Sequence, residues 1–305
     1  MDGTCDFRLA ESTRFSGWTT PLGALGVSTN TTVNINGEFL GSGNSVSLAA
    51  FLAQDAAVVR EMVRSNVLPM MHGGASTTVL LVIDIETPAR PDSFYAMNDT
   101  TLRRVVAALR LRVAVLKQVM PRCTVSFYGA PTRLYVAKAL PGYRRASALG
   151  LFDDVDYSTP SLYLSPGQDP ANVTSDVLRC AAEGILRSDG TPVPLAPFLS
   201  WVYEGQKGGR QWHCALSAAM MRTQLDLLER AGKARVPIIA WFNGYDNKTV
   251  STPAMNMVAC DLCDHSDRLL VITGSVRRLP RSAGIYAAER FCPVALPGVT
   301  EFKVK

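Results

Sequence analysis

Residues 77–86 read TTVLLVIDIE, a run of apolar and β-branched residues that ends in two carboxylates. A run with no charge before its end is typical of a strand that is buried on both faces. Successive side chains of a strand point to opposite faces, so Asp84 and Glu86 share one face, with Cα atoms about 6.6 Å apart. Buried strands rarely end in two acids on one face without a use for them, which makes this pair a candidate catalytic site.

Two carboxylates held side by side disfavour double ionisation, because each negative charge repels the other. One of them is then able to keep a proton near neutral pH and to donate it to a substrate. The plainer alternative is that Asp84 and Glu86 only end the strand, either in solvent or as the cap of a following helix.

Similar apolar runs recur along the chain, with helical periodicity between them. We expect strands near 77–86, 122–128, 160–164, 193–203, 236–242 and 268–274, and a weaker one at 31–36. Helical patterns occupy 47–65, 100–120, 172–187, 213–232 and 282–290. Alternating strands and helices predict parallel strands that are joined by right-handed crossovers.

The fold class that fits this alternation is α/β, as a single TIM-like (β/α) barrel, distorted, with seven or eight strands. We expect one catalytic domain over 1–305, of which 1–45 is poorly patterned. The chemistry of such barrels lies at the carboxyl ends of the strands. The aromatic residues that end other predicted strands are candidate substrate-binding residues: Tyr128, Tyr163, Tyr203 and Trp241.

Composition excludes several classes of protein. The chain has 305 residues, 47% of them hydrophobic, which is enough for a large core. Its net charge of +5 is small and dispersed, so we expect no nucleic-acid partner, although an anionic substrate is compatible with it. No apolar stretch is long enough for a membrane span. The arginines of the helix predicted at 100–120 are expected on its solvated face: Arg103, Arg104, Arg110 and Arg112.

Four Asn-x-Ser/Thr sequons favour a secreted or secretory-pathway glycoprotein, although the N-terminus carries no signal-peptide pattern. They lie at Asn30, Asn98, Asn172 and Asn247. Among seven cysteines, the pair Cys260 and Cys263 has zinc-like spacing, but no second pair completes a four-ligand site. We therefore expect disulfides or free thiols, and neither a metal nor another cofactor.

The motifs, in their order along the chain, resemble the hyaluronidases of the bee-venom and mammalian type, glycoside hydrolase family fifty-six. They are Asp-x-Glu at 84–86, Phe-Tyr-Gly-x-Pro at 127–131, Pro-Ser-Leu-Tyr-Leu at 160–164, Pro-Val-x-x-x-Pro-Phe at 192–198 and Ile-Ile-Ala-Trp at 238–241. The resemblance covers about 44–245. The chain departs from the family pattern at Thr87–Pro91, where a Trp-Arg-Pro run is usual, and at 133–135, where a cysteine is common.

The resemblance implies a hyaluronidase-like endo-N-acetylhexosaminidase that acts on a polysaccharide. Glu86 would donate a proton to the glycosidic oxygen, and Asp84 would orient the substrate acetamido group. That group would itself be the nucleophile, so that the anomeric configuration is retained and no enzyme carboxylate is glycosylated. Tyr128, Tyr163 and Trp241 match the aromatic positions that line the pocket for the N-acetyl group.

Two other functions remain open. The motif VIDIET also resembles the first motif of DnaQ-like 3′-5′ exonucleases, whose acids bind two divalent ions. In that fold an antiparallel strand follows directly, whereas a Pro-rich loop and a long helix are predicted here, and no His-Asn-x-x-Phe-Asp segment follows. A catalytically silent glycan-binding barrel is the other alternative. The oligomeric state is not predicted.

Overall fold

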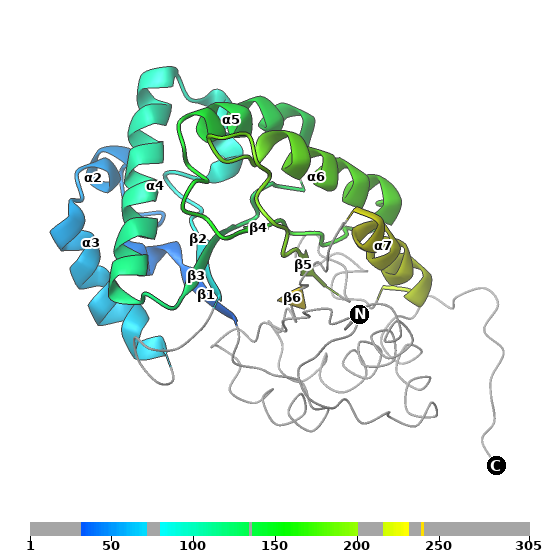
Figure 1. Ribbon diagram of the computed structural model, residues 1–305, viewed down its shortest axis with the longest axis horizontal. Helices are drawn as coiled ribbons and strands as arrows, with labels where there is room; N and C mark the ends of the chain where they lie inside the picture. The colour runs from blue at the N-terminus through cyan, green and yellow to red at the C-terminus, as the bar shows by residue number, and fades with distance from the viewer. Residues whose placement is uncertain (1–31, 72–79, 134–135, 201–215, 232–238, 241–305) are drawn as a thin grey trace, which may run out of the picture.

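The computed structural model describes residues 32–71, 80–133, 136–200, 216–231 and 239–240. In this part of the chain the helices form an arc along the outer side of the strands (Figure 1). Strands and helices alternate along the sequence, so the predicted α/β class is confirmed.

Four parallel strands form a sheet in the order β1-β2-β3-β4, which is also their order along the chain. They are β1 (Thr32–Asn36), β2 (Leu80–Asp84), β3 (Thr124–Tyr128) and β4 (Tyr157–Thr159). A second parallel pair consists of β5 (Phe198–Leu199) and β6 (Ile239–Ala240). Parallel bridges from Ser158 to Leu195 and from Ser161 to Phe198 link the two groups of strands.

Helices join each strand to the next. Between β1 and β2 lie η1 (Gly37–Leu40), α2 (Leu48–Leu52), α3 (Ala56–Met62), the π-helical turn η2 (Val63–Val67) and η3 (Leu68–Met70). Between the later strands lie η5 (Pro91–Ala96), α4 (Asp99–Val119), α5 (Val136–Ala148), α6 (Pro170–Gly184) and α7 (Ala218–Ala231). The long helix α4 begins at Asn98, whose side chain accepts a hydrogen bond of 2.8 Å from the backbone nitrogen of Thr101.

The single helix predicted over 47–65 is wrong, because the chain forms two helices there. α2 ends at Leu52, and α3 begins after Asp55. The Asp55 carboxylate accepts hydrogen bonds of 2.9 Å from the backbone nitrogens of Ala57 and Val58. An aspartate in this position satisfies the free N–H groups of a new helix, which favours a restart over continuation.

The strand predicted at 160–164 lies earlier in the chain. The strand β4 ends at Thr159, and after Pro160 only Ser161 of this described segment makes a further bridge, which is parallel and pairs it with Phe198. Proline has no N–H to donate to a neighbouring strand, so it interrupts the ladder.

Helix α5 is absent from the sequence-based prediction, since Pro141 and Gly142 are poor helix formers. In the structure Gly142 lies against η5. A Cβ at this position would be 2.4 Å from the backbone nitrogen of Tyr95, so the close contact between α5 and η5 requires glycine. Tertiary packing therefore outweighs local propensity here.

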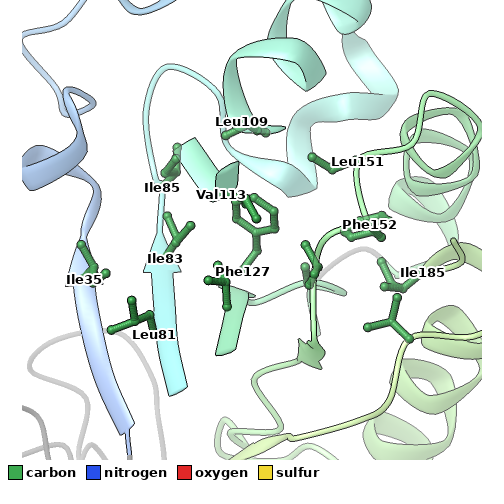
Figure 2. Close-up of a cluster of buried hydrophobic side chains, with 14 of the residues drawn as sticks. Ile35, Leu81, Ile83, Ile85, Leu109, Val113, Phe127, Leu151, Phe152 and Ile185 are labelled. Carbon is green, nitrogen blue, oxygen red and sulfur yellow. The ribbon is translucent and has the colours of Figure 1, made fainter. Parts of the chain in front are cut away.

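The strand β2 is buried on both faces, as its sequence predicts. Leu81, Ile83 and Ile85 belong to the large core that the sheet forms with α4 and the other helices (Figure 2). Leu80 and Val82 belong to a second, smaller cluster. We call the side of the sheet that carries Leu80 and Val82 the inner face.

Arg112 of α4 is fully buried, so its predicted place on a solvated helix face is wrong. Its Nε donates a 2.9 Å hydrogen bond to the carbonyl of Leu40, and its Nη2 donates to Gln54 Oε1. The guanidinium carbon lies 3.8 Å from the ring centroid of Phe51. Burial lowers the pKa of Arg112 to about 10. These contacts make the charge tolerable inside the protein and tie η1 and α2 to α4.

Two of the seven cysteines, Cys123 and Cys180, are buried free thiols. Burial raises the pKa of Cys123 to about 11 and that of Cys180 to about 12, so both thiols stay protonated at neutral pH. The remaining cysteines, including Cys260 and Cys263, lie outside the described residues.

Of the four sequons, those at Asn98 and Asn172 lie within the described residues, and both asparagines are exposed. Asn30 and Asn247 lie outside them. Within the described ranges, none of the helices combines the length and apolar character needed to cross a membrane.

Candidate functional site

The two predicted acids lie at the carboxyl end of β2. Asp84 is the last residue of the strand and, by alternation with Leu80 and Val82, belongs to the inner face. Its side chain is half-buried, whereas Glu86, two residues beyond the strand, is exposed. The strand is thus shorter at this end than predicted, and the two acids differ in their access to solvent.

The loop that carries Glu86 is anchored to the loop that follows η1. The backbone nitrogen of Gly43 donates a 2.8 Å hydrogen bond to the carbonyl of Thr87, and Thr87 Oγ1 lies 3.1 Å from Asn44 Oδ1. At the end of β1, a Cβ at Gly37 would lie 2.7 Å from the carbonyl oxygen of Asp84. Glycine therefore allows η1 to pass close to the strand end that carries the acids.

Tyr128 is the last residue of β3, which pairs with β2 so that Phe127 lies opposite Ile83. Its ring packs edge-on against Phe198 at a centroid distance of 5.1 Å. The ring of Tyr163 lies 6.5 Å from that of Tyr128, and Tyr163 is buried in the inner-face cluster. The structure thus brings these two predicted binding residues together on the inner face.

The phenol of Tyr128 stays protonated well above neutral pH. Burial raises its pKa to about 12, and the negative charge of Asp84 acts in the same direction. Hydrogen bonds with the side chains of Ser161 and Tyr163, together with the positive charge of Arg133, partly oppose that rise. A neutral phenol is a hydrogen-bond donor, which suits it to bind a carbonyl oxygen or a developing negative charge.

Arg133 is a site residue that the sequence-based prediction does not include. It follows β3 in the loop before α5, and its Nη1 donates to the carbonyl of Tyr163. Its guanidinium carbon lies 5.5 Å from the ring centroid of the same tyrosine. A basic residue shortly after a strand end would have been the available signal, since this end of a parallel sheet carries the chemistry in α/β folds.

The other two predicted binding residues, Tyr203 and Trp241, lie outside the described residues. In the described part of the chain, no group of three or more His, Cys, Asp or Glu side chains is placed to hold a metal ion.

No protein-family model matches the chain, and the sequence of no curated protein matches it. Solved structures do match. The fold resembles that of bee venom hyaluronidase. A crystal structure of that protein has a TM-score of 0.55 and 12% sequence identity with this chain, and the match covers 86% of this chain and 97% of the other. A structure of bee venom hyaluronidase in complex with a hyaluronic acid tetramer has a TM-score of 0.52 and 13% identity, with 86% and 96% covered.

The likeness to bee venom hyaluronidase extends over nearly the whole of that protein, so it concerns the arrangement of the entire fold and not one motif. At 12% identity it shows the fold alone. A family eighteen chitinase from Pseudoalteromonas aurantia gives a lower TM-score of 0.42 at 12% identity, with 70% of this chain and 69% of the chitinase covered.

Proposed function

We propose that this chain is a single-domain (β/α) barrel that hydrolyses an N-acetylhexosamine-containing polysaccharide, hyaluronan or a chondroitin-like chain. The observation that supports the proposal is that Tyr128 and Tyr163 lie side by side on the inner face, to which Asp84 at the carboxyl end of β2 also belongs, with Glu86 two residues further along the chain. This end is where α/β barrels perform their chemistry. The fold likeness to bee venom hyaluronidase, and the crystallised complex of that protein with hyaluronic acid, support the choice of substrate.

In the proposed reaction the substrate acetamido oxygen attacks the anomeric carbon while Glu86 gives its proton to the departing glycosidic oxygen. The sugar forms a cyclic oxazolinium ion, and the other half of the polymer leaves as an alcohol. Water then attacks the anomeric carbon, Glu86 takes up a proton from it, and the acetamide is restored. Two displacements at one carbon retain the anomeric configuration, without the glycosyl-enzyme of two-carboxylate glycosidases.

The half-buried carboxylate of Asp84 is suited to accept a hydrogen bond from the acetamide N–H, which becomes more acidic as positive charge develops in the ring. The neutral phenol of Tyr128 and the side chain of Tyr163 lie on the same face and can hold the acetamido group in line for attack. Trp241 is assigned to the sugar-binding surface by the sequence resemblance, and Tyr203 by its place at the end of a predicted strand. Glu86 needs no burial to meet a polymer, because its exposed position leaves it open to a chain that lies across the strand ends.

The strand pairing favours the hydrolase over the exonuclease. In the exonuclease fold the acid-bearing strand is followed at once by an antiparallel strand. Here β2 is followed by η5 and the long helix α4, and it pairs in parallel with both β1 and β3. The exposed sequon residues Asn98 and Asn172 are compatible with the secretory setting in which a glycoprotein of this kind would act.

The test is digestion of hyaluronan and chondroitin, with and without EDTA, beside single-stranded DNA, with the anomeric configuration of the first product followed by NMR. Cleavage that resists EDTA and releases the retained anomer supports the proposal. Degradation of DNA that EDTA abolishes would assign the exonuclease instead, and tight binding of glycan with no cleavage would assign the silent barrel.

A further inference from the structure

Arg133 holds a fixed position beside the candidate site. It is half-buried in the loop after β3, with its guanidinium over the ring of Tyr163 and a hydrogen bond to the carbonyl of that residue. Both contacts hold the guanidinium group at the end of the side chain. The loop itself is attached to α5, because the backbone nitrogen of Thr132 donates a 3.0 Å hydrogen bond to the hydroxyl of Tyr143.

The positive charge of Arg133 is not neutralised by an ion pair among the described residues. Other arginines of this part of the chain do pair with carboxylates, such as Arg144 with Glu183 and Arg145 with Asp99. A guanidinium carries five N–H donors in one plane, and the hydrogen bond to the carbonyl of Tyr163 uses a donor of Nη1. The remaining donors match the geometry of a carboxylate, which arginine binds with two parallel hydrogen bonds.

Arg133 lies near a negative charge on the inner face, that of Asp84. Asp84 lies at the end of β2, and its negative charge would repel a polymer that is itself negatively charged. Asp84 and Arg133 act in opposite directions on the phenol of Tyr128, so both lie within electrostatic reach of the same hydroxyl. A cation at this place would offset the repulsion between Asp84 and an acidic polymer.

We propose that Arg133 is a specificity-determining residue that binds the carboxylate of a uronic acid in the polysaccharide, next to the N-acetylhexosamine whose bond is cleaved. This inference rests on the proposed function, which it deepens by assigning the recognition of the acidic sugar to one residue of this chain.

The test compares Arg133→Gln with Arg122→Gln. Both changes remove one positive charge, but Arg122 is exposed before the start of β3, at the opposite end of the same strand. Each variant is assayed on hyaluronan and on carboxyl-reduced hyaluronan, a neutral polymer with the same linkages. Arg133→Gln should raise KM for hyaluronan roughly 10- to 100-fold, as expected for loss of a charge-assisted hydrogen-bonded pair, and should leave KM for the reduced polymer nearly unchanged. Arg133→Lys should recover part of the loss, and Arg122→Gln should behave as the parent.

Equal loss on both polymers would overturn the inference, because it would show that Arg133 only supports Tyr163. So would an unchanged KM for hyaluronan. If the parent cleaves neither polymer, the proposed hydrolysis fails, and calorimetric titration with hyaluronan oligosaccharides then tests Arg133 by itself. Binding that Arg133→Gln weakens and Arg122→Gln does not would support the inference without catalysis, and binding that is equal in both variants, or absent from the parent, would overturn it.

Discussion

The ring of Tyr128, at the end of β3, lies 6.5 Å from the ring of Tyr163, although the whole of α5 and β4 separates the two residues along the chain. Both rings lie on the inner face, the side of the sheet to which Asp84 belongs.

Glu86→Gln should lower kcat by about 10²–10⁴-fold, because glutamine cannot supply the proton that the glycosidic oxygen needs. Glycan binding and the temperature of unfolding should stay nearly those of the parent, since the Glu86 side chain is exposed. The matched control is Glu61→Gln on the outer helix α3, which makes the same chemical change away from the site. Full activity of Glu86→Gln on a substrate that the parent cleaves would show that another residue is the acid.

Asp84→Asn should reduce kcat and also displace one limb of the pH–rate profile, because removal of one charge changes how readily the neighbouring carboxyl ionises. The measurement is kcat against pH for the parent and the variant, with the two limbs assigned to the pair of acids jointly. A profile that keeps its shape while only KM rises would show that Asp84 binds substrate without coupling to Glu86.

Tyr163→Phe should lower kcat more than it raises KM, since a phenol that steadies the acetamido group as nucleophile matters most in the transition state. Steady-state kinetics on the cleaved glycan give the two constants separately. Tyr95→Phe, on η5, serves as the control because it removes a phenol outside the inner face. A rise in KM with no change in kcat would place Tyr163 in ground-state binding only.

Arg112→Met should lower the free energy of unfolding by about 2–4 kcal/mol, because methionine fills the space of the stem and leaves the Leu40 carbonyl and Gln54 Oε1 without their buried donor. Urea unfolding followed by circular dichroism measures the loss. Arg104→Met, on the exposed side of α4, should change stability by less than about 0.5 kcal/mol. Equal stability of the two variants would show that the buried charge contributes nothing net.

The raised pKa of Tyr128 makes stability fall in alkali. Above about pH 10 the unfolded chain releases the phenol proton, whereas the folded protein keeps it until its own pKa of about 12. The unfolded state then binds fewer protons than the native state, so the free energy of unfolding decreases as pH rises through this window. Tyr143, whose pKa burial also raises, adds to the same decrease.

Urea unfolding at a series of pH values from about pH 9 to about pH 11 should therefore show a shallower decrease in Tyr128→Phe than in the parent. Because Tyr143 is present in both proteins, its contribution cancels from the comparison. Identical slopes would mean that the phenol of Tyr128 titrates normally in the folded protein.

The sequence pattern predicts several residues of the candidate site, because they lie where apolar runs end. The apolar run before Asp84 predicts a strand that is buried on both faces, and the structure places Leu81 and Val82 in two different cores. The placement of Tyr128 at the end of β3 follows from the same pattern. Arg133 lies in a loop without periodicity, so nothing local indicates that its side chain turns back over Tyr163.

The sequence by itself determined the alternation of strands and helices, because hydrophobic periodicity is a local property that each segment carries alone. It also determined that two acids lie at the carboxyl end of a buried strand. Only the tertiary structure decided that Arg112 is inside, since a guanidinium is buried only where carbonyls and a ring from other segments receive it. The same holds for α5, which forms across Pro141 and Gly142 because close packing on η5 supplies the free energy that local propensity lacks.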